Sequence, residues 1–565
     1  MPELLAAARL HDELVNRSGL SLWIGAEPTF TRRDSQDAPW LFAPEGGDKE
    51  QKARELLSAI ARALEVPAWL FRAEGRLYPG EQVPRFCYGA HWTRGARGPI
   101  AGAAGMDAPP SRPPPWEPET AWLTVTPDPG VVEVNLAPAP DLATFAELSE
   151  AVYRAAAEVG LAPERFRFNG QAADSGGGGQ LTLGGPTPEQ SPFLLRPQLL
   201  PSLVRYLNHH PALSYAFATE CVGSASQGPR ADEGVRERFE ELQVSLDRLA
   251  ARGDAATPEE LWESLAPLLV DSAGNSHRAE LNVEKLWNPH SGARGKLGLL
   301  ELRSLRMAPD LERMVALGAL FRSLAARFAL QPFEEPLVEW GSALHDRFAL
   351  PHFLEEDLRQ VLDELEEHGM ELPPLLRGAL LRPEPPLAEE TLKGATLSIR
   401  PALEFWPLLG DVASQERAGA RLFDPSTQRL QLELRVPSGE LRGRVSAEGW
   451  EVPLQRAGSQ GRQELYVGAV RYRAWMPGPG LHPGLQPVDP LELTWERGGE
   501  ALAITLHGWI PGGGVYTGLP ADAEEARRRR EERVIVRRGV PPSGARRAPA
   551  GGDGVLALDL RRLAR

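Results

Sequence analysis

Charged and apolar residues alternate in several short segments that lie far apart along the chain. The alternation is clearest around Glu27, Glu133 and Glu301. Since successive side chains of a β-strand point to opposite faces, each segment is predicted to be a strand with one polar and one apolar face. The apolar anchors of these strands are Ile24, Val132, Val134, Leu300 and Leu302. A chain built this way is constrained to form a sheet with a packed apolar face and a charged face that can line a polar, metal-binding cleft.

Length and composition limit the classes of protein to consider. A chain of 565 residues exceeds what one hydrophobic core usually serves, so we expect two or three domains. The apolar fraction of 42% and the charged fraction of 25% are typical of a globular protein, not a disordered one. A formal charge of -15, with no basic stripe along the chain, argues against nucleic acid as a partner.

The cysteines and the hydropathy pattern point to a cytoplasmic protein. Cys87 and Cys221 are the only cysteines, which excludes a disulfide framework and a cysteine-based zinc site and fits a reducing compartment. The first residues carry charges where a signal peptide would be apolar, and no uncharged apolar run is long enough to cross a bilayer. We therefore expect no membrane partner.

The order of predicted elements indicates an α+β fold. Asp141 is a plausible helix N-cap and Gly160 a plausible helix stop, and Pro127 to Gly130 has the composition of a tight turn between two strands. Strands are predicted over residues 20–30, 122–126, 131–136, 165–169, 180–183, 277–286 and 296–307. Helices are predicted over residues 1–15, 48–64 and 141–159 and through much of 192–267 and 310–365. This pattern predicts a mainly antiparallel sheet with helices stacked on it.

A composition shift divides the chain. After about Pro383, short β-rich runs separated by glycine and proline predict an all-β sandwich. We therefore expect a first domain over residues 1–383, a β-sandwich accessory domain over 384–520, and a charged helix with a tail over 521–565.

Glu27 and Glu133 are candidate metal ligands. Hard divalent cations such as Mg²⁺ take oxygen ligands and usually lie between a few carboxylates and the phosphates of a nucleotide. The alternative is that each glutamate is exposed to solvent or paired with an arginine. Asn135 shares a face with Glu133, so it either orients a ligand or merely decorates the strand.

Two predicted strands combine arginine with acid. Arg278, Glu280 and Asn282 share one face of the first, and Glu301 and Arg303 share one face of the second. Such pairs are most often structural, but buried charges need partners or a ligand. Arginine suits phosphoryl oxygens because its planar fork donates two hydrogen bonds, and phosphoryl transfer needs metal and fixed cations together.

The run Gly176 to Gly179, which includes Gly178, either forms a flexible loop or cradles phosphates with its backbone. It is not a Walker A loop, because no Lys-Ser/Thr follows it. His277, His345 and His352 are candidate bases or ligands, although a structural role is commoner for histidine. A peptidase has no supporting motif, since neither cysteine lies in a nucleophile motif and no G-x-S-x-G elbow is present.

Eight segments follow one another along the chain: they are WIGAEPTFTRRDS, PDPGVVEVNLAP, GGPTPEQSPFLLRP, LNHHPALSYAF, SQGPRADE, LLVDSAGNSHRAELNVEKLW, GLLELRSLRM and WGSALHDRFALPHF. In this order they together resemble a bacterial amidoligase family. The resemblance covers about residues 10 to 520. In that family the region usually follows a transglutaminase-like domain, so any activity of such a domain would be supplied in trans. The family is placed in the glutamine synthetase-like superfamily of carboxylate-amine ligases.

This resemblance implies site roles. Glu27, Glu133 and Glu301 are similar to metal ligands on an antiparallel sheet, and Arg303 and Arg278 to residues that bind the nucleotide's phosphates. Asn135 and Gly178 would contact the nucleotide, and Gln180 would offer an oxygen to the metal. The chain departs from the superfamily pattern in three places, with Thr29 and Val125 where acids are expected and Gln180 where the family has histidine.

The expected function is therefore an ATP- and Mg²⁺-dependent amidoligase that joins a carboxylate to an amine, with peptides among the candidate substrates. The resemblance also implies a transglutaminase-like or ATP-grasp-like protein as partner. The alternative is a catalytically weakened scaffold that binds a nucleotide or peptide and assembles with a transglutaminase-like protein.

Overall fold

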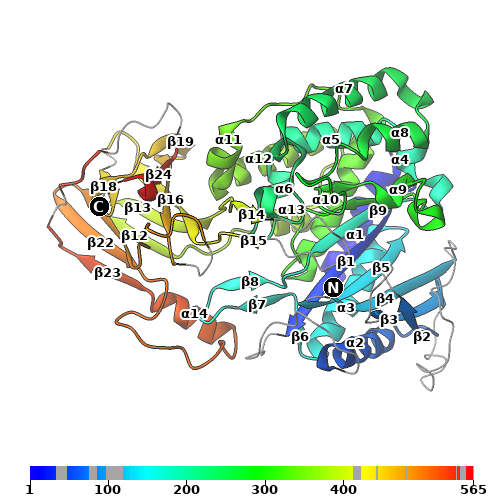
Figure 1. The fold of residues 1–565 in the computed structure, drawn as a ribbon, viewed down its shortest axis with the longest axis horizontal. Coiled ribbons are helices and arrows are strands. Elements are labelled where there is room, and N and C mark those ends of the chain that lie inside the picture. Colours follow the sequence, from blue (N-terminus) through cyan, green and yellow to red (C-terminus); the bar gives the residue numbers. More distant parts are fainter. Residues whose placement is uncertain are drawn as a thin grey trace.

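The structure is a computed structural model of the chain. It describes residues 1–32, 47–75, 85–96, 119–128, 130–410, 422–440, 443–476, 480–541, 544–547 and 555–563. Figure 1 shows two parts side by side, with the N-terminal sheet and its helices in one and the C-terminal strands in the other. The proline- and glycine-rich stretch after Gly95 lies largely outside the described residues.

Nine strands of the described chain form one sheet in the N-terminal part, in the order β10-β11-β9-β1-β5-β4-β3-β2, with β6 paired to β1. Their bounds are β1 Trp23–Arg32, β2 Trp69–Gly75, β3 Arg85–Thr93, β4 Thr120–Asp128, β5 Val131–Ala139, β6 Leu161–Ala162, β9 Gly179–Gly184, β10 Leu281–Asn282 and β11 Leu300–Leu302. The strand pairs of this sheet within the described residues are antiparallel. The β4–β5 pair is the predicted hairpin, and Gly130 in its turn has a φ of 84°.

One face of the sheet carries the hydrophobic core. Ile24, Val132, Val134, Leu300 and Leu302 are all buried, as the alternation predicts. Helices α1 Pro2–Asn16, α2 Asp48–Leu64, α3 Leu142–Glu158 and α10 Leu311–Leu330 contribute their apolar sides to the same core. Asp141 caps α3 by accepting a hydrogen bond from the Thr144 amide, which confirms the predicted N-cap.

Further helices pack beyond α10 and extend this core to residue 380. They are α4 Pro192–Leu195, α5 Leu199–His209, α6 Ala212–Tyr215, α7 Arg236–Arg252, α8 Pro258–Leu265, α9 Glu284–Trp287, α11 Ser342–Asp346, α12 Pro351–Glu367 and α13 Pro374–Leu381. No helix in the described ranges has the length and apolar character needed to span a membrane.

The C-terminal part contains two facing sheets with a common apolar core that includes Trp495. One sheet is formed by β12 Ala388–Leu392, β13 Ala395–Ala402, β16 Thr427–Pro437, β19 Gln455–Gln460, β20 Gln463–Arg473 and β24 Ala557–Asp559. The other is formed by β17 Arg444–Ala447, β18 Trp450–Glu451, β21 Leu491–Arg497, β22 Glu500–Leu506 and β23 Val534–Arg538. A small pair, β14 Leu408–Gly410 with β15 Leu422–Phe423, lies beside them.

The residues after 521 do more than form a charged helix and a tail. The helix is present as α14 Ala523–Glu531, but β23 then pairs with β22 and β24 pairs with β20. The end of the chain is thus part of both sheets. Mixed helices and antiparallel sheets confirm the predicted α+β class.

A hairpin from the N-terminal part reaches the C-terminal part. It consists of β7 Glu164–Phe166 and β8 Ala172–Asp174, and Figure 1 shows it extending toward α14. At its turn, the Phe168 carbonyl accepts a hydrogen bond of 2.7 Å from Arg529, and the Gly170 carbonyl accepts one from Arg530. The Asn169 side chain donates to the Gly508 carbonyl at 3.1 Å.

Two of the predicted strands are much shorter than expected. The segment 277–286 forms only the two-residue strand β10 before it turns into α9, and the segment 296–307 forms only β11. Arg278 therefore lies in a bend before β10 and does not share a strand face with Glu280 and Asn282. The Asn282 side-chain oxygen instead accepts a hydrogen bond of 2.7 Å from the Glu284 amide, at the beginning of the α9 turn.

Candidate functional site

Strand register brings four predicted site residues onto one face of the large sheet. Glu27 of β1 lies opposite Gln180 of β9, and Glu133 of β5 lies opposite Thr29, two residues beyond Glu27. On the other side, Glu301 of β11 lies opposite Thr182, two residues beyond Gln180. Since directly opposed residues and residues two apart share a face, these side chains project from four neighbouring strands to one side. We call Glu27, Glu133, Gln180 and Glu301 the carboxylate face.

A lysine that the sequence pattern did not reveal lies between two of these acids. Lys285 of α9 has its Nζ 2.6 Å from Glu27 Oε1 and 3.3 Å from Glu301 Oε2. Its side chain is 35% exposed, whereas that of Glu301 is 1% exposed. Lys285 belongs to a helical turn that follows the strand, so the period of two used to find the strand residues could not select it.

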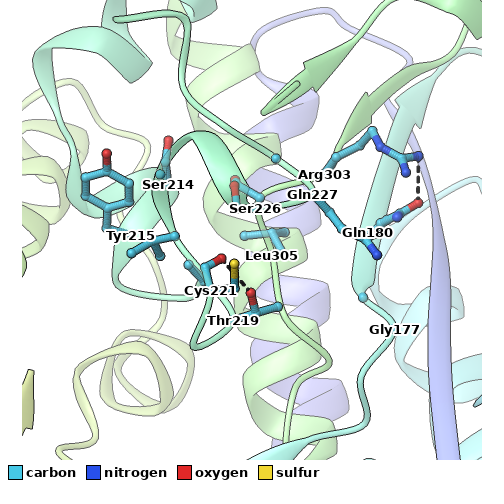
Figure 2. Close-up of a pocket in the computed structure, with 16 residues that line it drawn as sticks. Gly177, Gln180, Ser214, Tyr215, Thr219, Cys221, Ser226, Gln227, Arg303 and Leu305 are labelled. Carbon is cyan, nitrogen blue, oxygen red and sulfur yellow. Dashed lines mark hydrogen bonds between the residues drawn. The ribbon is translucent and has the colours of Figure 1, made fainter. Parts of the chain in front are cut away.

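Arg303 connects Glu301 to Gln180. Its Nη1 donates to Glu301 Oε1 at 2.6 Å and to Gln180 Oε1 at 3.2 Å, and Figure 2 shows the second bond. The predicted Glu-x-Arg pair is therefore formed. The Gln180 side-chain oxygen, which was expected to bind a metal, instead accepts a hydrogen bond from the Arg303 guanidinium. The Nε of Arg303 is buried and has no hydrogen-bond partner.

The electrostatics of the three acids differ. Burial raises the pKa of Glu27, and the nearby Glu301 carboxylate raises it further. Burial, with the charges of Glu27 and Asp128, raises the pKa of Glu133 to about 8. The Asn135 amide opposes this by donating to Glu133 Oε1 at 2.9 Å, so Asn135 positions Glu133.

Glu301 is held as a carboxylate. Burial alone would raise its pKa, but Arg303 and Lys285 outweigh burial and lower the pKa. Its Oε2 is nevertheless buried without a hydrogen-bond partner. The three acids of the carboxylate face thus meet only two cations, Lys285 and Arg303, so the acids could not all be ionised with each charge paired.

The glycine run is anchored to this face by Thr29. The Thr29 hydroxyl donates to the Gly178 carbonyl at 2.7 Å and forms a 2.6 Å hydrogen bond with the Ser175 hydroxyl. A Cβ at Gly177 would lie 2.7 Å from the Thr29 side chain, so glycine is required for this close approach. Thr29, where the resemblance implied an acid, therefore supports the loop that leads to Gln180.

Val125 is not part of the site. It is fully buried on β4, with its side chain on the core face of the sheet. Its neighbours Thr124 and Thr126 lie opposite Asn135 and Glu133 instead. The residue at the place where the resemblance implied a metal-binding acid is therefore a core residue.

Glu280 also lies away from the carboxylate face. It accepts a 2.6 Å hydrogen bond from Ser214 and one of 3.2 Å from the Ala231 amide. Beside it, the fully buried Arg230 pairs with Asp232 and donates to the Leu207, Asn208 and Ser214 oxygens. We call Arg230, Asp232, Glu280 and Ser214 the Arg230 cluster. Arg278 is half-buried, and its backbone amide donates a hydrogen bond to the Asn275 carbonyl.

The candidate histidines are not on the carboxylate face. His277 pairs with Glu284 at 3.0 Å, and His345 pairs with Glu233 at 3.2 Å and stacks on Phe405. The backbone amide of His352 donates to Gln431 in the C-terminal part. None of these contacts involves a residue of the carboxylate face.

A pocket opens beside Arg303 and Gln180. Figure 2 shows these two residues on one side and Ser214 and Tyr215 on the opposite side. The glycine run forms part of the wall, together with Thr219, Cys221 and Ser226. Apart from Arg303, the residues that line the pocket are uncharged, so an anionic ligand group would be drawn to the Arg303 end.

The donor set of the carboxylate face fits a hard divalent cation in its chemistry. All four side chains offer oxygen, the acids outnumber the cations beside them, and one buried carboxylate oxygen lacks a hydrogen-bond partner. As the side chains lie now, no three His, Cys, Asp or Glu groups in the described ranges are arranged to hold a metal ion. The ammonium of Lys285 lies between two of the required carboxylates.

Comparison with solved structures gives distant matches. One is titled as a crystal structure of a novel glutamine synthase homolog, with 16% identity over 67% of this chain and 69% of that chain and a TM-score of 0.33. A structure titled as a GmaS complex with ADP and one titled as GmaS without ligand each have 12% identity and a TM-score of 0.30; both cover 67% of this chain, and 72% and 71% of theirs. No curated protein matches the chain.

A family comparison covers nearly the whole sequence. The family described as "Putative amidoligase enzyme" matches residues 2–100 and 111–561. The match includes every residue of the carboxylate face, Lys285, Arg303 and the C-terminal sheets. This coverage supports a ligase-type function. The chain therefore belongs to this amidoligase family.

Proposed function

We propose that the protein is an ATP- and Mg²⁺-dependent carboxylate-amine ligase that forms an amide or peptide-like bond through an acyl phosphate. The observation that carries the proposal is the position of Arg303. It contacts Glu301 on the carboxylate face, where acids outnumber cations, and it is the charged residue at one end of the pocket. Phosphoryl transfer to a carboxylate needs negative groups for a metal and fixed positive groups for phosphate, and both meet here.

The reaction would proceed in two steps. A carboxylate oxygen of the substrate forms a bond to the γ-phosphorus of ATP while the bond to ADP breaks. The amine nitrogen then bonds to the acyl carbon, inorganic phosphate leaves, and the amine loses a proton. Arg303 is well placed to bind the substrate carboxylate or the transferring phosphoryl group at the pocket's end.

Glu27, Glu133 and Glu301 would hold the metal, which supplies charge neutralisation for the phosphates when bound. Asn135 orients Glu133, and Thr29 fixes the glycine loop at the pocket wall. We keep Arg278 as a proposed phosphate-binding residue, since it is half-buried on the segment that leads into β10.

The proposal is tested with purified full-length protein, ATP, Mg²⁺ and matched sets of carboxylates and amines, including short peptides. We expect ADP formation that requires both substrates, and transfer of ¹⁸O from a labelled carboxylate to phosphate, which is the signature of an acyl phosphate. Glu301→Ala and Arg303→Ala should each lower this turnover by about 10²-fold or more. Glu312→Ala, which alters an exposed ion pair with Arg382, serves as the control and should leave turnover unchanged.

A second candidate is favoured by one contact. Lys285 lies where a cation would bridge Glu27 and Glu301, as expected for a weakened scaffold that binds a nucleotide or peptide without turnover. Such a scaffold would partner a transglutaminase-like protein. Binding of ATP with Mg²⁺ but no turnover with any pair of substrates would favour the scaffold and contradict the ligase.

A further inference from the structure

Lys285 is held in a defined position by its own backbone. Its carbonyl accepts hydrogen bonds from the Leu297 and Leu299 amides, at 3.0 and 3.2 Å. The α9 turn that carries it begins at Glu284, whose amide is bonded to the Asn282 side chain. The ammonium is therefore delivered to the carboxylate face by a fixed backbone and a flexible four-carbon side chain.

The ammonium offsets a repulsion that the fold otherwise imposes. Glu27 and Glu301 project from strands on either side of β9, and the Glu301 charge acts directly on Glu27. Lys285 contacts both carboxylates, at 2.6 and 3.3 Å, while Arg303 contacts only Glu301 of these two. Among the described contacts, Lys285 is thus the cation that joins Glu27 to Glu301.

The contact with Glu301 is incomplete. Its Oε2 is close enough to Lys285 for an ion pair but accepts no hydrogen bond. The lysine side chain as a whole is also about a third exposed. A monovalent cation that has one good hydrogen bond and is carried by a flexible, partly exposed side chain is one that a divalent cation can displace.

Building on the proposed metal site, we infer that Lys285 is a resident cation of the carboxylate face: it joins Glu27 to Glu301 when no metal is bound, and it leaves them when a divalent cation binds. The exchange would keep the acids from repelling each other in the metal-free protein. It would also make metal affinity depend on a residue that is not a metal ligand.

The first test measures Mn²⁺ binding to the full chain by electron paramagnetic resonance, without nucleotide. Lys285→Met should bind Mn²⁺ at least about tenfold more tightly than the wild type, because the competing ammonium is gone. Lys285→Arg keeps a cation and should bind close to the wild-type level. Lys296→Met is the matched control, since Lys296 lies over the Trp287 ring and should leave the affinity unchanged.

The second test follows the lysine itself in the wild-type protein. Acylation of Lys285, measured by mass spectrometry, should be slow without metal and several-fold faster with saturating Mg²⁺, while Lys296 changes little. This readout does not need a folded variant.

The outcomes separate the two ideas. If the wild type binds Mn²⁺ but Lys285→Met binds it no more tightly and acylation of Lys285 does not rise, the exchange is wrong while the metal site stands. If neither protein binds Mn²⁺, the exchange and the metal requirement of the proposed ligase both fall. Tighter binding together with faster acylation supports the exchange.

Discussion

The Arg230 cluster and the carboxylate face are both buried groups of acids and bases, yet only one of them is complete. In the Arg230 cluster, the guanidinium donates to Asp232, Ser214 and two backbone carbonyls, and both oxygens of Glu280 accept hydrogen bonds. On the carboxylate face, Glu301 Oε2 and Arg303 Nε have no hydrogen-bond partner.

The difference separates structure from function. A fully satisfied ionic cluster needs no ligand to balance its charges, and these charges hold the loops together. A cluster that has more acids than cations, and buried polar atoms without a hydrogen bond, is costly unless something else binds there. The sequence segments of both clusters resemble the same family, so only the geometry tells them apart.

The largest expected effect breaks the complete cluster. Arg230→Met should lower the free energy of unfolding by about 3–5 kcal/mol, because it leaves the buried Asp232 without its counter-ion. Denaturant unfolding of the full chain measures the loss. Arg236→Met removes an exposed pair with Glu240 and should change stability by less than about 0.5 kcal/mol. A comparable loss in both variants would mean that the Arg230 cluster is no more important than a surface ion pair.

A smaller effect should come from the carboxylate face, and it should depend on pH. The raised pKa of Glu133, about 8 against an ordinary 4.5, means that the folded protein holds this proton more tightly than the unfolded chain. Stability from this group is complete below about pH 4.5 and is lost as the pH rises toward 8.

In metal-free buffer, the free energy of unfolding of Glu133→Gln minus that of the wild type should therefore increase by about 1–3 kcal/mol when the pH is raised from about 5 to about 9. Thermal or denaturant unfolding at both pH values measures this gain. A difference between the two proteins that stays constant with pH would show that Glu133 is not undercompensated, and the contrast between the clusters would weaken.

The smallest effect concerns the support of the site. Thr29→Val keeps the side-chain shape but removes the hydrogen bonds to Ser175 and Gly178. We therefore expect the free energy of unfolding to fall by about 1 kcal/mol. Hydrogen exchange at the amides of residues 176–178 should become faster. Thr124→Val, on the same face of the sheet, is the control and should leave that exchange unchanged. Equal exchange in both variants would remove Thr29 from the support of the glycine loop.

Much of the sheet could be predicted because its signals are local. The alternation of polar and apolar residues identified the buried anchors Ile24, Val132 and Leu300, and the register then placed the acids on one face. The capping residue Asp141 could be predicted because aspartate is favoured at a helix N-cap, where its carboxylate accepts a hydrogen bond from the amide three residues later.

Other features depend on contacts that no local pattern encodes. Lys285 reaches Glu27 across a sequence separation of 258 residues, from a turn that looks like the end of a strand. Arg278 and Glu280 were assigned to that strand because polar and apolar residues alternate there too, but backbone bonds to Pro229 and Asn275 bend the segment away. The resemblance implied an acid at Val125, but the alternation along β4 places this residue on the core face.

The β7–β8 hairpin connects the N-terminal part to the C-terminal part through hydrogen bonds at its turn. Its turn is gripped by Arg529 and Arg530 of α14, and its last strand ends at Asp174, whose side chain accepts the amide of Gly176. A protein shortened before α14 would lose that grip, and the pocket wall would lose its far anchor. The C-terminal part thus supports the hairpin that leads to the glycine run, and the two parts should be studied as an undivided chain.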